Sequence, residues 1–286
     1  MALVVAVNPT GPDLFNRPHP LTRRPVTLTM PRHFLALTFL ALAAILPATL
    51  MTAAPADTRV FELRTYTTPP GKLPNLLARF RDHTCALFEK HGMTNVAYWV
   101  PADEKDGSAD KLVYLLAYPS REAAKASWAA FMADPEWKAV REASEVDGKI
   151  VAKVESIFLA PTDYSPAITS SSKSPSRVFE LRTYTTPDNK LAALDARFGG
   201  GETDLFKKAG MQEFGYFHPL DADKGAANTL IYIMAHESRE AAAKSWQSFR
   251  DDPVWVKMKA DTEVDGPLAS KVVSVFLHPT DFSATK

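Results

Sequence analysis

The sequence repeats itself at a constant offset of 118 residues, and this feature constrains the fold more than any other. Residues 59–69 recur letter for letter as residues 177–187. The same offset carries Trp128 onto Trp246 and Trp137 onto Trp255, with no insertion or deletion between the two copies. A duplication this regular indicates two copies of one supersecondary unit.

Each copy predicts the element order βαββαβ. In the first copy, alternating and β-branched residues predict strands at 60–67, 96–100, 112–118 and 151–159. Apolar residues at helical spacing predict a helix from residue 73 to about residue 90, ended by Gly92. Ser120 and Asp134 are expected to cap two further helical segments. This order is the ferredoxin-like unit, whose helices cover one face of the sheet and leave the other bare.

A bare sheet face that carries aromatic residues is too apolar to remain in water. We therefore predict an α+β fold of two tandem ferredoxin-like βαββαβ repeats whose sheets pack face to face as a dimeric α+β barrel of eight strands. The Ser- and Pro-rich linker at 165–176 is long enough to allow this within one chain. The alternative is that each repeat pairs with a repeat of another molecule. The chain is then either a monomer with an intramolecular barrel or a homodimer.

The segment before the repeats has the pattern of an export signal. A basic start at 30–33 leads into an apolar run at 34–46, followed by small residues that end in Ala-Pro-Ala at 54–56. The run is shorter than the roughly 20 residues that a membrane span needs. We predict that residues 30–56 are a signal peptide cleaved near Ala56, which leaves no stable membrane span and places the protein in the periplasm or outside the cell. The alternative is an uncleaved N-terminal anchor.

The predicted domain boundaries follow from this interpretation. Residues 1–29 are interpreted as an extension from a wrongly assigned start codon, with Met30 as the true initiator. The first repeat then occupies residues 57–164 and the second residues 177–286, joined by the linker.

Charge and cysteine content exclude several classes of function. The chain has 33 basic and 33 acidic residues, of which four and one lie in residues 1–56, so the predicted mature chain has a formal charge of −3. Such a charge provides no electrostatic footprint for nucleic acid. Cys85 is the only cysteine and therefore forms no intrachain disulfide. We interpret it as a small apolar residue on a helix rather than a lone nucleophile.

Several short motifs together resemble the NIPSNAP family. They are ELRTY in the first strand, HGM after the first helix, the pair Tyr98–Trp99, the SRE helix start and the Asp-Pro-x-Trp restart. The resemblance covers nearly the whole chain after the signal and implies the dimeric α+β barrel fold. It implies little about function, since the trafficking and mitochondrial signalling roles suggested for eukaryotic members do not fit an export signal. Related barrels include small monooxygenases and haem enzymes, which is an analogy of fold and not of site.

One face of the first strand in each repeat carries the polar candidates for a ligand site. We expect this face to line the barrel interior, where a carboxylate, a guanidinium and a phenol would hold a small-molecule ligand. The arginine fork suits a carboxylate or a phosphate. The alternative is that Glu62 and Arg64 simply pair with each other. The candidate barrel-lining residues are Glu62, Arg64, Tyr66, Tyr98, Tyr114, Glu180, Arg182, Tyr184, Tyr216, Tyr232 and His236.

The histidines do not indicate a metal or haem site common to both repeats, because no histidine occupies equivalent positions in the two copies. H-x-x-x-H, H-E-x-x-H and Cys/His clusters are also missing from the sequence. We therefore predict no metal and no cofactor. His91 could transfer a proton, but Ala209 replaces it in the second copy, which favours a structural turn. The repeated tryptophans of the later helices are interpreted as core rather than as a carbohydrate platform.

The sequence identifies no catalytic residue, since it contains no nucleophile elbow, phosphate loop or paired catalytic carboxylates. We predict an exported protein that binds a small, partly apolar ligand in its barrel. One alternative is a cofactor-free monooxygenase-like enzyme, which needs a roomy cavity and a polar pair such as Arg64 and Tyr66. The other is a purely structural or assembly module in which packing consumes the sheet face.

Overall fold

The computed structural model describes residues 57–171 and 176–286. The predicted signal peptide and the preceding extension lie outside the described residues, as do residues 172–175 of the linker. Each repeat has the predicted βαββαβ order. The first repeat contains β1 (Val60–Thr67), α1 (Leu73–Arg79), α2 (Cys85–Lys90), β2 (Thr94–Pro101), β3 (Lys111–Tyr118), α3 (Arg121–Ala133), α4 (Pro135–Ser144) and β4 (Lys153–Pro161). The second contains β5 (Val178–Thr185), α5 (Leu191–Arg197), α6 (Thr203–Lys208), β6 (Gln212–Pro219), β7 (Thr229–His236), α7 (Arg239–Asp251), α8 (Pro253–Thr262) and β8 (Lys271–Pro279).

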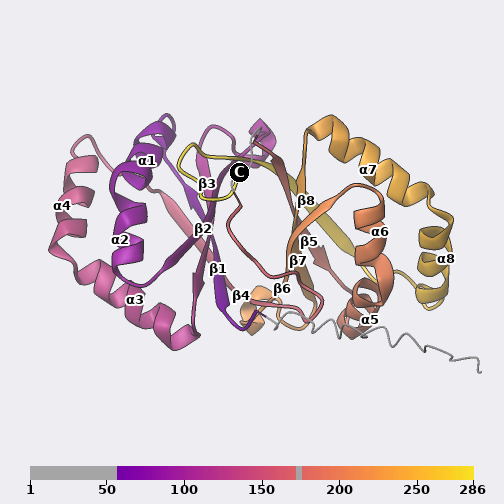
Figure 1. Ribbon diagram of the computed structural model, residues 1–286. Helices are drawn as coiled ribbons and strands as arrows, with labels where there is room; N and C mark the ends of the chain where they lie inside the picture. Colours follow the sequence, from indigo (N-terminus) through magenta and orange to yellow (C-terminus); the bar gives the residue numbers. More distant parts are fainter. Residues whose placement is uncertain (1–56, 172–175) are drawn as a thin grey trace, which may run out of the picture. The chain divides into compact units, whose positions relative to one another are not determined.

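The strands close into one antiparallel barrel in the order β1-β3-β2-β8-β5-β7-β6-β4. Within each repeat the first strand is central, so β1 pairs with β3 and β4. Two short junctions join the repeats: Val100 of β2 lies opposite His278 of β8, and Ala160 of β4 lies opposite His218 of β6. The helices of the first repeat cover one sheet and those of the second repeat cover the other (Figure 1). The predicted α+β barrel built from one chain is confirmed.

The helix predicted from residue 73 to about residue 90 is interrupted by a π-helical turn at Phe80–Thr84, between α1 and α2. The second repeat is interrupted at the equivalent residues, Phe198–Glu202, where Gly201 has a non-helical φ of 129° and kinks the helix. Such a turn inserts one extra residue and shifts the direction of the side chains that follow. Gly92 ends α2 as predicted, with a φ of 77° that glycine adopts without strain.

The starts of the later helices follow the predicted capping residues. The hydroxyl of Ser120 accepts a hydrogen bond from the backbone nitrogen of Ala123 over 3.2 Å at the start of α3. Asp134 accepts one from the nitrogen of Glu136 over 2.8 Å, and Pro135 occupies the first position of α4. Both caps satisfy backbone donors that a helix cannot satisfy internally.

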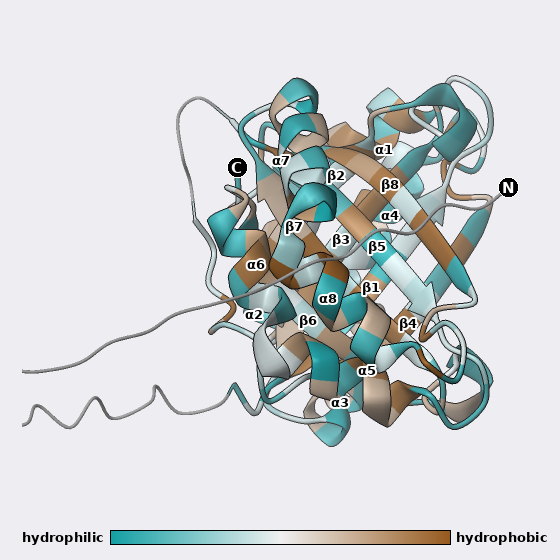
Figure 2. Cartoon of the chain, turned by 90° about the vertical axis from the view of Figure 1, so that its right-hand side faces the viewer, coloured by the Kyte–Doolittle hydropathy of each residue, from teal (hydrophilic) through white to brown (hydrophobic). Residues whose placement is uncertain are grey.

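The barrel interior is an apolar core built by both repeats. Phe61 of β1 and Phe217 of β6 meet there edge to face, with ring centroids 5.4 Å apart. Leu63, Trp99 and Leu277 belong to the same buried cluster. Two further apolar clusters fill the space between each sheet and its own helices. Figure 2 shows the hydrophobic colour concentrated on the strands beneath the more polar helices.

Within residues 57–171 and 176–286, no helix has the length and apolar character needed to cross a bilayer.

Candidate functional site

The polar candidates lie between each sheet and its helices, and not inside the barrel as predicted. Phe61 and Leu63 of β1 point into the barrel, whereas Glu62 and Arg64 point toward Trp128 of α3. The alternation of side chains therefore groups the residues correctly, but the predicted placement of that group was wrong. The residues on the helix-covered side are Glu62, Arg64, Tyr66, Tyr98, Tyr114, Glu180, Arg182, Tyr184, Tyr216, Tyr232 and His236.

The polar face could not be placed from the sequence because both faces of these strands are rich in apolar residues. Alternation shows which residues share a face, but it does not show which face meets the helices. The barrel interior takes the face without ionisable groups, because a charge buried there would have no water and few partners. The face with Glu62 and Arg64 lies under helices that supply hydrogen-bond partners.

Glu62 is only 1% exposed and is held by four donors. Its Oε1 accepts hydrogen bonds from Arg64 Nη1 and Ser156 Oγ, each over 2.5 Å. Its Oε2 accepts from the hydroxyl of Tyr118 and from Nε1 of Trp128, each over 2.8 Å. The alternative in which Glu62 and Arg64 pair with each other is therefore what the structure shows. A buried carboxylate so fully satisfied contributes to holding the helix on the sheet.

Glu180 repeats this arrangement in the second repeat. Its Oε1 accepts from Arg182 Nη1 over 2.5 Å and from Ser274 Oγ over 2.6 Å. Its Oε2 accepts from Trp246 Nε1 over 2.6 Å and contacts His236 Nε2 over 3.2 Å. Burial alone would raise the pKa of Glu180, but the hydrogen bond from His236, the charge of Arg182 and the other donors lower this pKa to about 2. The carboxylate is thus ionised at neutral pH.

Arg64 uses its hydrogen-bonding groups within its own repeat. Its guanidinium lies over the indole of Trp128, with its carbon 4.2 Å from the ring centroid. Nε donates to the hydroxyl of Tyr114 over 2.9 Å, and Nη2 donates to that of Tyr66 over 3.4 Å. This guanidinium therefore does not present a free fork to a ligand.

Arg182 differs from Arg64 in one contact. It lies over Trp246 at the same 4.2 Å, and its Nη2 donates to the Tyr184 hydroxyl over 3.3 Å. Its Nε, however, is buried without a hydrogen-bond partner among the described residues. The hydroxyl of Tyr232 pairs instead with that of Tyr184 over 3.0 Å. Burial and the neighbouring Tyr184 hold the pKa of Tyr232 well above its usual value, so Tyr232 remains a neutral hydrogen-bond donor.

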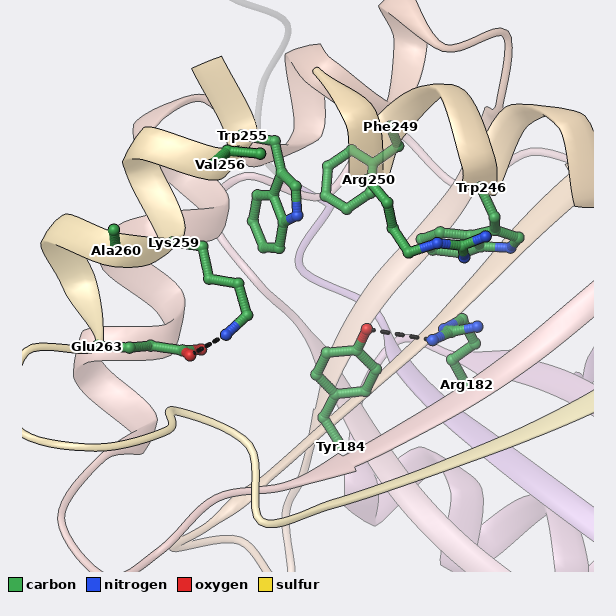
Figure 3. Close-up of a pocket in the computed structure, with 10 residues that line it drawn as sticks. All are labelled: Arg182, Tyr184, Trp246, Phe249, Arg250, Trp255, Val256, Lys259, Ala260 and Glu263. Carbon is green, nitrogen blue, oxygen red and sulfur yellow. Dashed lines mark hydrogen bonds and ion pairs between the residues drawn. The ribbon is translucent and has the colours of Figure 1, made fainter. Parts of the chain in front are cut away.

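A hollow of about 690 Å³ opens between β5, α7 and α8 of the second repeat, and we call it the α7–α8 hollow. Figure 3 shows Tyr184 rising from its strand toward the aromatic side chains of the two helices, with Arg182 beside its oxygen. A neighbouring hollow of about 530 Å³ shares Arg182, Trp246 and Arg250 with it. The α7–α8 hollow is lined by Arg182, Tyr184, Trp246, Phe249, Arg250, Trp255, Val256, Lys259, Ala260 and Glu263.

The first repeat has a hollow of about 610 Å³ with a more polar lining, which includes Glu62, Arg64 and Lys125. It corresponds by the repeat offset to the smaller hollow of the second repeat. Arg250, which lines both hollows of the second repeat, is replaced in the first repeat by Met132. The two repeats therefore share the buried Glu–Arg pair but differ at the mouth of the site.

Most charges around the α7–α8 hollow are already paired. Glu263 pairs with Lys259 and, over 2.8 Å, with Arg197. Arg197 also contacts the buried Glu202 over 2.8 Å, where burial raises the pKa of Glu202 to about 7 against the opposing charge of Arg197. Arg250 donates to the side-chain oxygen of Gln247 over 2.9 Å. It forms no ion pair within the part of the chain that the structure describes.

Two of the predicted tyrosines take no part in these networks. The hydroxyl of Tyr98 donates to Asn95, and its ring stacks on Tyr114 with centroids 5.4 Å apart. The hydroxyl of Tyr216 donates to Glu213 over 2.9 Å. Both tyrosines pack in the clusters between sheet and helices.

His91 and Cys85 have structural surroundings. Nε2 of His91 lies 2.7 Å from Oδ2 of Asp134, the residue that caps α4. Cys85 begins α2 half-buried, and burial raises the pKa of its thiol to about 11. No group of three His, Cys, Asp or Glu side chains that could hold a metal ion occurs in the described ranges.

Residues from other elements complete the site and were not among the predicted candidates. Ser156 of β4 and Tyr118 of β3 supply donors to Glu62, and Trp128 supplies another through a nitrogen that a purely apolar interpretation overlooked. A usable signal existed, because the serine recurs at the repeat offset as Ser274 inside a predicted strand. Positions identical in the two repeats could not indicate Arg250, because the repeat offset places it opposite Met132.

Comparisons with known proteins agree with this architecture. The sequence model of the NIPSNAP family matches residues 61–166 and 179–284. The protein NipSnap homolog of Dictyostelium discoideum is 24% identical over 209 residues, covering 72% of this chain and 82% of that protein. A putative monooxygenase of Fusobacterium nucleatum is similar in structure, with a TM-score of 0.52 at 7% identity over 78% of this chain and 92% of that one. An anthrone oxidase-like protein gives 0.51 at 15% identity over 80% and 95%. Similarity at these identities establishes a shared fold alone.

Proposed function

Since the chain belongs to the NIPSNAP family, with both of its repeats matched, we propose that it is an exported protein that binds a small, partly apolar ligand with an anionic group. The proposed site is the α7–α8 hollow of the second repeat. The observation that carries the proposal is Arg250, a cation without a carboxylate partner among the described residues, at the edge of an aromatic hollow.

The lining suits an amphipathic molecule. Trp246, Phe249 and Trp255 provide aromatic surface, and Val256 adds an aliphatic contact. Ligand sites are typically apolar hollows with a few polar groups that fix orientation. Arg250 would attract the anionic group, while the paired charges of Lys259 and Glu263 leave the far end of the hollow nearly neutral.

The barrel interior does not support the same role. It is filled by apolar side chains of both repeats, among them Phe61, Trp99 and Phe217. A ligand there would have to displace close-packed core residues. Removing one large core side chain costs roughly 3–5 kcal/mol, and displacing one is expected to cost a similar amount. The proposed binding site is therefore moved from the barrel to the helix-covered face.

The two alternatives to ligand binding, an enzyme and a structural module, need different features of the molecule. A cofactor-free monooxygenase-like enzyme would have to act in the α7–α8 hollow, because Arg64 and Tyr66 lie hydrogen-bonded beneath the first-repeat helices. A structural module would use exposed apolar residues such as Val254 and Val256 of α8 for association. Ligand-independent association that rises with concentration supports the module, and oxygen consumption with a bound substrate supports the enzyme.

Export rests on the sequence pattern of residues 30–56. Expression of the full chain with its native start, followed by N-terminal sequencing of the exported fraction, tests it. Cleavage near Ala56 is the expected result, and retention of the segment would favour the anchor instead.

The binding proposal is tested by titration of residues 57–286 with 8-anilinonaphthalene-1-sulfonate, an aromatic anion whose fluorescence rises in apolar sites. Arg250→Met, which copies the first repeat, is expected to weaken binding about tenfold, a loss typical of a removed charge-assisted contact. Met132→Leu at the equivalent position is the matched control and should bind like the unaltered chain. Equal affinity of Arg250→Met and the control would refute the proposed site.

A further inference from the structure

We propose that Tyr184 is the donor that holds the ligand in the α7–α8 hollow, and that it binds a single phenolate or enolate oxygen of an aromatic ligand. This inference rests on the proposed function for the position of the ligand. It adds the chemical class of the group that the hollow recognises.

The hydroxyl of Tyr184 has two hydrogen-bond neighbours among the described residues. Its oxygen accepts from Nη2 of Arg182 over 3.3 Å and is paired with the hydroxyl of Tyr232 over 3.0 Å. Tyr232 is fully buried, and Tyr184 is the partner of its hydroxyl among the described residues. Tyr232 must therefore donate its proton to Tyr184, because its proton would otherwise be buried without an acceptor.

The proton of Tyr184 consequently has no acceptor in the described chain. A hydroxyl has one proton to donate besides its capacity to accept, and the acceptor side of Tyr184 is filled by its two neighbours. Tyr184 also lines the α7–α8 hollow, whereas Tyr232 does not. A ligand oxygen in the hollow is thus the group that would satisfy this proton.

The donors beside Tyr184 limit how many ligand atoms the strand side of the hollow can hold. A carboxylate is bound best by two parallel N–H groups of one guanidinium. Arg182 is already engaged, because its Nη1 holds Glu180, its Nη2 holds the Tyr184 hydroxyl, and its Nε is buried. At the strand side of the hollow the Tyr184 hydroxyl offers one proton, which fits one oxygen atom, while Arg250 at the edge attracts the charge of that oxygen.

The surroundings of the Tyr184 hydroxyl favour a negatively charged ligand oxygen. Tyr184 receives hydrogen bonds from a cation and from a second phenol, and such chains polarise a hydroxyl and make it a stronger donor. A preorganised donor of this kind favours an oxygen that carries negative charge. The surrounding Phe249 and Trp255 rings suit an aromatic body, so a phenolate or an enolate conjugated to a ring matches the hollow.

The first repeat has the equivalent residues, but its arginine is bonded differently. There Nε of Arg64 donates to the Tyr114 hydroxyl over 2.9 Å, and Tyr66 accepts from Arg64 over 3.4 Å. In the second repeat the corresponding Nε of Arg182 has lost that partner. The Nε of Arg182 is thus a buried donor without a partner among the described residues, whereas the Nε of Arg64 is satisfied.

The test uses 4-nitrophenol, whose phenolate and phenol forms have different visible absorption bands. Titration of residues 57–286 across pH is expected to lower the apparent pKa of the bound probe, with about tenfold preference for the phenolate over the phenol. Tyr184→Phe should remove most of the preference, leaving the part that the charge of Arg250 supplies, and Tyr232→Phe should reduce it. Tyr66→Phe, the first-repeat equivalent, should leave it unchanged. Thermal unfolding of each variant confirms that it is folded.

Two results would overturn the inference: preferred binding of the neutral phenol, or an unchanged preference in Tyr184→Phe. The sulfonate titration keeps this outcome separate from the proposed function. Tyr184→Phe that retains sulfonate binding but has lost most of its phenolate preference supports both ideas. If Arg250→Met leaves sulfonate binding unchanged, the proposed function is refuted, whatever the 4-nitrophenol titration shows.

Discussion

Nε1 of Trp128 donates a 2.8 Å hydrogen bond to Oε2 of Glu62 and so ties α3 to β1 across 66 residues of sequence. The second repeat has the same bond between Trp246 and Glu180, over 2.6 Å. Apolar packing alone lets a helix slide on a sheet, whereas a buried directional bond allows one position. The repeated Glu–Arg–Trp arrangement is therefore structural, and Arg250, which the first repeat replaces with Met132, distinguishes the hollow of the second repeat.

Replacing the buried carboxylate should destabilise the protein. Glu62→Gln leaves the guanidinium of Arg64 without its ionic partner, and we expect a loss of about 2–3 kcal/mol in the free energy of unfolding. Urea denaturation measures it. Glu155→Gln on β4 is the control, since Glu155 forms an exposed pair with Lys153 and should cost less than about 0.5 kcal/mol. Equal effects of the two substitutions would show that the buried pair contributes nothing.

The stability supplied by Glu180 should disappear in acid. Its pKa is about 2 in the folded protein, whereas the ordinary pKa of a glutamate is 4.5, so the folded state binds the proton less well. The stabilisation is present above pH 4.5 and is lost as pH falls toward 2, by up to about 3 kcal/mol. The difference in unfolding free energy between the unaltered chain and Glu180→Gln should shrink across that window. A constant difference would mean that the carboxylate is not ionised in the folded state as described.

Glu202 should act with the opposite sign in a different window. Its pKa is raised to about 7 from 4.5, so the folded state binds the proton more tightly than the unfolded state. Its contribution is fully present below pH 4.5 and is lost as pH rises to about 7. Glu202→Thr, which copies Thr84 of the first repeat, should remove this decline. Stability curves that stay parallel between pH 4.5 and 7 would argue against a raised pKa.

A core substitution should separate stability from binding. Phe61→Ala removes a ring buried in the barrel interior against Phe217, and we expect a loss of about 3–5 kcal/mol. Because the α7–α8 hollow lies outside the barrel, the folded fraction should bind the sulfonate probe with unchanged affinity. Calorimetry at low temperature measures both the loss of stability and the affinity for the sulfonate probe. A selective loss of affinity would place the ligand in the barrel after all.

Much of the fold could be predicted from the repeat and from alternation. The strand at 60–67 and the caps at Ser120 and Asp134 follow from local sequence, because each depends on residues close in the chain. The face that Glu62 and Arg64 share is also local information. Which side of the sheet that face occupies depends on how the helices and the second sheet compete for it, and this is set by packing across the whole chain.

The candidate site was predictable only in part for the same reason. Tyr184 and Arg182 were identified, but the orientation of their hydrogen bonds depends on Tyr232 of another strand. Arg250 comes from α7 and has no equivalent in the first repeat. Positions that are identical in the two repeats therefore could not indicate Arg250, because Met132 stands at the equivalent position.

The most direct test of the central claim is amide hydrogen exchange of residues 57–286 with and without 8-anilinonaphthalene-1-sulfonate. We expect added protection in α7 and α8, around Trp246 and Trp255, with the first-repeat helices α3 and α4 unchanged. Protection confined to the barrel strands, or equal in both repeats, would contradict a ligand site in the α7–α8 hollow.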